Sequence, residues 1–502
     1  MPAEPVNNPA DRDRDQLKVK VARTIKWTVI DKLSVQVLYA ITGVVLALKL
    51  TQADFGLVGA VLVFQAFGSL FVDSGFASAL IQRKAPTRAD YSTVLWFNIA
   101  MAVILYVILF FSAPIIADWY GGDKRIIPLA RVMFLTFIIN ATSIVQVNRL
   151  NKMMEMKMVA VANSVGLFAG SVAGIGMALA GFGAWSIVGQ SLLLSSVKSA
   201  ILWLTSGWTP NAVFSLRILK SFFRVGCGVM ITSFFNVLYL NIYSFLIGTR
   251  VGMVGLGYYS QADKWSKMGV SSLSAVITSS FLPVLSRYQD DPPEYAAVTS
   301  KFGRLTAYLA FPALGILAAL APAIFHTLFG HKWDGSIVLF QLLLLQGMFV
   351  VVSGLYSNFI LARGKARLLI ISEAVRYAVA LIAIIITYPH LRLSSVSDTT
   401  EGIRIFLYGQ VVASVAFWAI MTLLAARVTW RKWWELPLDL APYLAESLLV
   451  VLAIGLVYRL PVPSWAIILI GSFVGGAVYI GINGILHSKI QQDALAFIRK
   501  KL

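Results

Sequence analysis

Residues 91–112 read YSTVLWFNIAMAVILYVILFFS and contain no charged side chain. A helix rises 1.5 Å per residue, so this stretch forms a helix of about 33 Å, close to the roughly 30 Å hydrocarbon thickness of a bilayer. Stretches of the same kind recur from residue 27 to residue 487, and short polar segments separate them. The repetition predicts an all-α, polytopic membrane protein.

The number of apolar stretches predicts about 14 transmembrane helices. A faint internal repeat, DFGL (54–57) and GLGYY (255–259) with six spans between them, is what two six-helix lobes would give, followed by two C-terminal helices. The predicted spans are residues 27–49, 55–80, 91–112, 126–147, 159–181, 184–205, 223–248, 265–285, 302–325, 335–361, 367–388, 403–426, 442–460 and 464–487. The first span contains charged residues and the eighth is rich in serine, so both should face protein or a watery cavity instead of lipid. The corresponding predicted parts are a cytoplasmic N-terminal arm (1–26), an N-terminal lobe (27–222), a C-terminal lobe (223–427) and a C-terminal helix pair with its tail (428–502).

The charge pattern excludes a soluble or nucleic-acid-binding protein. Hydrophobic residues make up 58% of the chain and charged residues only 13%, whereas about a quarter of the residues in soluble domains are charged. The net charge of +19 comes from small basic groups between apolar runs. With the N-terminus inside, 29 of the 42 lysines and arginines fall in cytoplasmic segments and ten in outer loops. This positive-inside bias predicts a protein of the cytoplasmic (inner) membrane with both termini in the cytoplasm.

The sequence gives little support for a metal site, a cofactor or an enzyme. The single cysteine, Cys227, lies in an apolar run, and the four histidines are scattered; His326 and His331 are five residues apart in a predicted loop. We expect no metal and no cofactor. The loops are short and the outer ones carry no paired carboxylates, so we expect a transporter and not an enzyme.

Several motifs resemble one family. They are TQADFGLV (51–58), FVDSGFASALIQRK (71–84), GYYSQAD (257–263), PVLSR (283–287) and LFGHKW (328–333). Together they resemble polysaccharide flippases of the MOP superfamily, of the colanic-acid and exopolysaccharide exporter type. The resemblance implies two lobes around a central cavity. It also implies transport of undecaprenyl-linked polysaccharide repeat units from the inner to the outer leaflet.

Two other functions stay open at this point. One is a drug or cation antiporter of the MATE type, and the other is a membrane glycosyltransferase or polymerase acting on the same lipid-linked sugars. The expected partners of a flippase are the lipid-linked oligosaccharide, the bilayer, and the polysaccharide polymerase with its chain-length machinery. No nucleic acid is expected.

Charged residues inside spans are the first candidates for substrate contacts, because an isolated charge in a bilayer is unfavourable. Arg376 lies roughly 13 Å into its span, and Glu373 precedes it by three positions on the same helical face. The two residues form either a local ion pair or a substrate contact. Arg131 either contacts substrate or extends its side chain to the outer membrane interface. Lys198 lies near the cytoplasmic end of its span, and its side chain is expected to extend to the inner interface in the same way.

The remaining candidates lie in spans 1, 2 and 7. Asp31 and Lys32 either line the inner mouth of the passage or form pairs at the cytoplasmic edge. For Asp73 we expect an intramolecular partner, either Arg83 or a helix N-terminus.

Three polar residues of span 7 share one helical face: Asn236, Tyr239 and Tyr243. Tyrosines stack on sugar rings, but they also join helices. The spacing of Gly166, Gly170 and Gly174 predicts close packing of one helix against another.

Overall fold

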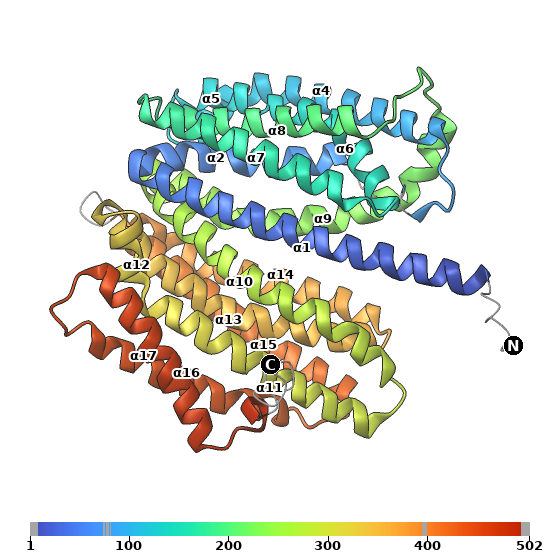
Figure 1. The fold of residues 1–502 in the computed structure, drawn as a ribbon. Coiled ribbons are helices and arrows are strands. Elements are labelled where there is room, and N and C mark those ends of the chain that lie inside the picture. The colour runs from blue at the N-terminus through green and yellow to red at the C-terminus, as the bar shows by residue number, and fades with distance from the viewer. Residues whose placement is uncertain (1–8, 74–75, 77–79, 81, 394–398, 493–502) are drawn as a thin grey trace, which may run out of the picture. The chain divides into compact units, whose positions relative to one another are not determined.

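The computed structural model describes residues 9–73, 76, 80, 82–393 and 399–492. Every regular element within these residues is a helix (Figure 1), which confirms the predicted all-α class. Thirteen of the described helices are long and apolar enough to cross a membrane. The eighth predicted span lies in α10 (Met253–Arg287), a serine-containing helix of 35 residues that is about 52 Å long. The architecture is therefore that of a membrane protein with roughly 14 transmembrane helices.

The chain forms two compact units, Met1–Leu256 and Gly257–Leu502. The helices of the first unit are α1 (Pro9–Lys49), α2 (Gln52–Asp73), α4 (Arg88–Trp119), α5 (Ile126–Met133), α6 (Leu135–Lys152), α7 (Met156–Leu179), α8 (Trp185–Thr205) and α9 (Leu216–Val251). Helix α9 thus belongs to the first unit, although the predicted second lobe begins at residue 223. The division into two six-helix lobes stays a prediction.

The second unit begins within α10, a few residues after that helix starts. Its further elements are α11 (Pro292–Ala319), α12 (Ala321–Leu328), η1 (His331–Trp333), α13 (Asp334–Ala362), α14 (Ala366–Thr387), η2 (Tyr388–Leu393), α15 (Glu401–Thr429), α16 (Glu435–Val457) and α17 (Ser464–Ile485).

Two predicted spans are each built from two helices. Span 126–147 is divided at Phe134, between α5 and α6, and span 302–325 is divided at Leu320, between α11 and α12. The second break has a local cause, because Pro322 lies in the first turn of α12 and has no N–H to continue the hydrogen-bond ladder of α11. The sequence around Phe134 offers no comparable reason for the first break.

Helices α7 and α8 pack backbone to backbone through the predicted glycine stripe. A Cβ atom on Gly166 would lie 2.9 Å from the carbonyl oxygen of Leu194, and one on Gly170 would lie 2.6 Å from that of Gln190. Both separations are shorter than a side chain tolerates, so the close approach depends on glycine. The prediction of tight helix packing at Gly166, Gly170 and Gly174 is confirmed.

The turn between α1 and α2 is held by the TQADFGLV motif. One carboxylate oxygen of Asp54 accepts hydrogen bonds from the N–H (2.9 Å) and hydroxyl (2.7 Å) of Thr51. The other accepts from the N–H of Ala184 at the start of α8 (3.0 Å). Two residues further on, a Cβ atom on Gly56 would lie 1.8 Å from the carbonyl oxygen of Met253. The motif therefore fastens the start of α2 to α8 on one side and to the α9–α10 junction on the other.

The two C-terminal helices pack against α11 and α12. Leu320, Val450, Ile454 and Tyr479 belong to one buried apolar cluster. Polar contacts reinforce it: the Tyr479 hydroxyl donates to the Tyr308 carbonyl (2.9 Å), and the buried side chains of Glu446 and Asn483 join α16 to α17 (2.6 Å). Helices α16 and α17 are thus an integral part of the second unit.

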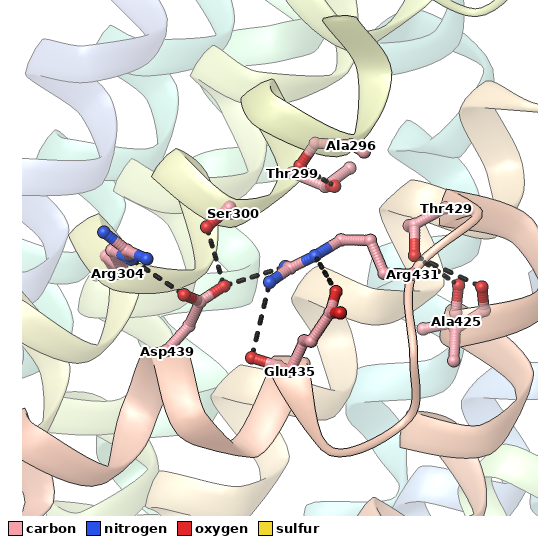
Figure 2. A network of polar contacts seen from close by, with 10 residues as sticks. Ala296, Thr299, Ser300, Arg304, Ala425, Thr429, Arg431, Glu435 and Asp439 are labelled. Atoms are coloured by element: carbon pink, nitrogen blue, oxygen red, sulfur yellow. Dashed lines mark hydrogen bonds and ion pairs between the residues drawn. The ribbon is translucent and has the colours of Figure 1, made fainter. Parts of the chain in front are cut away.

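A network of charges ties the start of α16 to α11, as Figure 2 shows. Asp439 is 5% exposed and receives three contacts of 2.8 Å, from Arg304 Nε, Arg431 Nη1 and Ser300 Oγ. Arg431 also lies 3.4 Å from the Glu435 carboxylate. The buried carboxylate of Asp439 therefore forms ion pairs with two arginines from different parts of the chain.

Candidate functional site: a polar cavity between α1, α2 and α8

The first unit contains a cavity of about 350 Å³ between α1, α2 and α8. Most of the residues that line it are polar although the helices themselves are apolar. The lining consists of Tyr39, Leu62, Gln65, Ala66, Ser69, Ser191, Leu194 and Ser195. Each of the three helices thus contributes at least one residue with a hydroxyl or amide group to the lining.

Gln65 is the amide of this lining. Its Nε2 donates to the hydroxyl of Thr136 on α6 (3.0 Å), and that hydroxyl donates in turn to the Met133 carbonyl (2.7 Å). The Gln65 Oε1 is buried and has no hydrogen-bond partner among the described residues. Buried polar atoms are nearly always satisfied in proteins by protein, water or ligand. The bond to Thr136 therefore fixes the side chain, and its buried oxygen accepts no hydrogen bond from the described residues.

A charged cluster lies beside the cavity. The Asn163 amide of α7 donates to both carboxylate oxygens of Asp31 on α1 (3.2 and 3.3 Å). Lys198 of α8 lies within electrostatic range of Asp31, and its Cβ packs against Gly166 of α7. Since Lys198 follows Ser195 by three residues, it continues the cavity-lining face of α8 by one turn. The structure therefore brings predicted site residue Asp31 together with Lys198.

Lys32 is a second cation of α1. It is exposed and precedes the cavity-lining Tyr39 by seven residues, or about two turns, which places both residues on one face of the helix. Lys32 and Lys198 outnumber the carboxylate of Asp31, so the net charge of these three residues is positive.

Arg376 and Glu373 form an ion pair of 2.5 Å within α14. The guanidinium also lies 5.2 Å from the centre of the Tyr377 ring. Both charged side chains are partly exposed, 25% for Arg376 and 44% for Glu373. This is the local ion pair that the three-residue spacing allows. A contact of Arg376 with substrate stays a prediction.

Arg131 is not among the residues that line this cavity. Arg131 Nε donates to the Phe110 carbonyl of α4 (3.2 Å), and its guanidinium lies 4.2 Å from the Phe110 ring. Asp73 ends α2, but its side chain lies outside the described residues. Arg83, one of its two predicted partners, forms an ion pair of 2.9 Å with Asp90 at the start of α4.

The three polar residues of α9 differ in exposure. Tyr243 is buried, Tyr239 is half-buried and Asn236 is exposed. Tyr243 therefore acts in helix packing in this structure, whereas Asn236 is accessible. A sugar contact by any of the three stays a prediction.

Sequence reasoning alone missed the cavity. It singled out charged residues within spans, whereas the lining is made of serines, a glutamine and a tyrosine, which occur in many spans without a ligand. Asn163 was missed for the same reason. A serine at every fourth position of α8 (Ser191, Ser195, Ser199) is the signal that was present.

The arrangement suits a ligand that has many hydroxyl groups and a negative charge. Serine, tyrosine and glutamine side chains both donate and accept hydrogen bonds, as sugar hydroxyls do, and a lysine ammonium attracts phosphate as a compact point charge. The described lining offers no ordered set of metal ligands. The lining therefore offers hydrogen-bond donors and acceptors suited to binding such a ligand.

Comparison with known proteins adds a family and relatives. The family described as polysaccharide biosynthesis protein matches residues 45–338. The chain is 26% identical over 348 residues to the teichuronic acid biosynthesis protein TuaB of Bacillus subtilis (strain 168), covering 68% of this chain and 71% of that protein. It is 25% identical over 313 residues to the succinoglycan biosynthesis transport protein ExoT of Rhizobium meliloti (strain 1021), covering 62% and 63%.

Solved structures share the fold. The lipid II flippase MurJ in an inward closed conformation matches with a TM-score of 0.71 and 14% identity, covering 92% of this chain and 99% of that one. An inward-facing multidrug resistance MATE transporter of the MOP superfamily matches with a TM-score of 0.54 and 18% identity, covering 81% and 98%. At these identities the likeness establishes the fold.

Proposed function

Because this chain belongs to the polysaccharide biosynthesis protein family, matched over residues 45–338, we propose that it is a flippase for lipid-linked polysaccharide repeat units. The resemblance to MOP-superfamily flippases drawn from the motifs is confirmed by this family and by the shared fold. One similar protein is named as a transport protein of succinoglycan biosynthesis and another as a lipid II flippase. These similarities support a transporter of lipid-linked oligosaccharide, and we propose this role in place of an enzyme of the pathway.

The observation that carries this proposal is the polar cavity with its neighbouring charges in an otherwise apolar helix bundle. An ionised side chain in the middle of a membrane costs about 2.5–3.5 kcal/mol or more when it faces lipid. Asp31 lies within the first span, where Asn163 donates to both of its carboxylate oxygens and Lys198 lies within electrostatic range. A bundle that only had to anchor itself in the membrane would not need this cluster.

The chemistry of the proposed substrate explains the cavity lining. An undecaprenyl-diphosphate-linked sugar carries two phosphates and many hydroxyls, none of which crosses hydrocarbon unaided. Serine, tyrosine and glutamine side chains of the cavity replace water around the hydroxyls, and Lys198 with Lys32 attracts the diphosphate. The lipid tail stays in the bilayer. Arg376 of α14 is a second candidate contact for the diphosphate.

The direction of transport is part of the proposal. We propose movement from the inner to the outer leaflet of the cytoplasmic membrane, with both termini in the cytoplasm, and work alongside a polysaccharide polymerase and its chain-length machinery. The biased distribution of lysine and arginine between alternate loops supports this orientation.

The orientation makes a direct prediction. Alkaline phosphatase, which is active only outside the cytoplasm, is fused after residues 85, 122, 212 and 332. We expect activity from the fusions at 122 and 332 and none from those at 85 and 212. Activity at 85 or 212 would show that the proposed orientation, with the N-terminus in the cytoplasm, is wrong.

The function is tested by locating the lipid-linked oligosaccharide. In deletion cells we expect it to accumulate on the cytoplasmic leaflet, hidden from an external lectin or periodate probe, and wild-type protein should restore exposure. Lys198→Gln should lower the restored exposure at least about tenfold, because loss of one charged contact of 1.5–3 kcal/mol corresponds to a factor of ten or more. Protein level and gel-filtration profile are measured for each variant.

Controls separate substrate binding from a structural role of the cluster. Lys124 is an exposed lysine of the loop before α5, and Lys124→Gln should export normally. If the double variant Asp31→Asn/Lys198→Gln exports as wild type, the charges serve only each other and the diphosphate contact is wrong. Equal exposure of the oligosaccharide in deletion and wild-type cells, with increased drug sensitivity in the former, would favour a drug antiporter.

A further inference from the structure

Two histidines and an aspartate meet at the turn between α12 and α13, outside the cavity already described. His326 lies in the last turn of α12, His331 begins η1, and Asp334 begins α13. His326 Nε2 lies 3.0 Å from Asp334 Oδ1, and His331 Nδ1 lies 3.6 Å from Asp334 Oδ2. One nitrogen or oxygen atom from each residue lies within 4.8 Å of the other two.

The turn that presents these residues is fixed by its buried neighbours. Gly330 adopts a φ of +80°, which turns the chain back between the two histidines. Phe329 and Trp333, on either side, are 3% and 0% exposed. The Trp333 ring packs edge-on against the Tyr258 ring, with 6.2 Å between the ring centres. The side chain of His331, by contrast, is 81% exposed, so exposed ligand atoms are held on an anchored backbone.

The distances are compatible with one metal ion held by all three residues. Zinc binds nitrogen and oxygen at about 2.0–2.2 Å, so two ligands in tetrahedral coordination lie about 3.3–3.6 Å apart. The two separations from Asp334, 3.0 and 3.6 Å, bracket this range within a few tenths of an ångström. The contact of 3.6 Å is too long for a hydrogen bond. A single carboxylate can satisfy His326 by hydrogen bonding, but it leaves His331 Nδ1 without this interaction.

We propose that His326, His331 and Asp334 form a binding site for one divalent transition-metal ion of the zinc class. Two imidazoles and one carboxylate are a ligand set that zinc, copper and nickel prefer, whereas magnesium and calcium prefer oxygen ligands alone. The exposed side of the cluster leaves a fourth position for water. The bound ion joins the end of α12 to the start of α13 and stiffens the turn. In the proposed orientation this site faces the outside of the cell.

The test uses untagged full-length protein in detergent, stripped with EDTA and titrated with Zn²⁺ alone in a calorimeter. We expect one ion per chain and a melting temperature that rises with Zn²⁺, because a ligand that binds only the folded state stabilises it. Both His331→Ala and His326→Ala should weaken binding at least about tenfold, since even outer-shell partners of metal sites contribute a factor of 10–100. A second readout is the quenching of tryptophan fluorescence by Cu²⁺ in wild type compared with His331→Ala, since Trp333 is one of 13 tryptophans.

The matched control is His390→Ala, because His390 is also an exposed histidine of the second unit but lies in η2. This variant should bind Zn²⁺ as wild type does. Gel filtration confirms that each variant is folded; His331→Ala removes a side chain that is mostly exposed. Failure of the wild-type protein to bind Zn²⁺, or equal binding by the His331, His326 and His390 variants, would overturn the proposal. Neither outcome depends on whether the protein is a flippase.

Discussion

Gly56→Ala is expected to remove most of the folded protein from the membrane. The new Cβ atom would lie 1.8 Å from the Met253 carbonyl oxygen and 2.6 Å from its carbonyl carbon. Both are backbone atoms, so no side chain can rotate away and α2 must separate from the α9–α10 junction. Overpacking of ordinary cores costs about 1–3 kcal/mol of stability. A clash with backbone atoms at this distance should cost at least the upper value of that range. The measurement is the monodisperse peak of a fluorescent fusion in gel filtration.

The control for this prediction is Gly176→Ala in α7. A Cβ atom at Gly176 meets nothing within 4 Å, and alanine is the better helix former by about 1 kcal/mol. This variant should give a peak equal to wild type. If Gly56→Ala also gave a normal peak and melting temperature, the close approach of α2 to Met253 would be wrong.

Asp439→Ala should lower the apparent melting temperature strongly. The carboxylate is 5% exposed and contacts Arg304, Arg431 and Ser300 at 2.8 Å each. Removal leaves Arg431, only 11% exposed, with Glu435 at 3.4 Å as its remaining acidic partner in this network. Breaking a buried pair by deleting one partner costs about 3–5 kcal/mol. Thermal unfolding in detergent, followed by tryptophan fluorescence, measures the shift.

Glu435→Ala is the matched comparison. Glu435 contacts the same arginine, but its carboxylate is 38% exposed and the distance is 3.4 Å. Partly exposed ion pairs contribute roughly 0–1 kcal/mol, so this variant should melt within a few degrees of wild type. Similar melting temperatures for the Asp439 and Glu435 variants would mean that the network in Figure 2 does not hold α16 to α11.

The helices could be predicted from the sequence because membrane spans are a local property. Uninterrupted apolar stretches such as residues 91–112 must satisfy their own backbone hydrogen bonds in lipid, and only a helix does so. The breaks within two of the spans were harder to predict from the sequence. Pro322 could have predicted the break at Leu320, whereas the break at Phe134 has no local signal and depends on packing.

The candidate site was only partly predictable because its contacts join distant residues. Asp31 was identified as a charge within a span, but its partner Asn163 lies 132 positions away. Lys198 was interpreted as extending to the interface, since a lysine near a span end usually does so. Likewise, two histidines five residues apart gave no metal-site pattern until the turn at Gly330 placed Asp334 beside them. For Asp31 and Lys198 the missing information was which helices are neighbours, and for the histidines it was the path of the chain through the turn at Gly330.

The contact between Glu446 and Asn483 has a consequence for the order in which the chain is made. Glu446 lies about 16 Å along α16, near the middle of its span, and its partner is synthesised 37 residues later. When α16 leaves the ribosome, its carboxyl group therefore has no amide to accept from, and entry into lipid alone is unfavourable. We expect α16 to wait at the membrane insertion machinery until α17 arrives, so that the two helices enter as a hairpin.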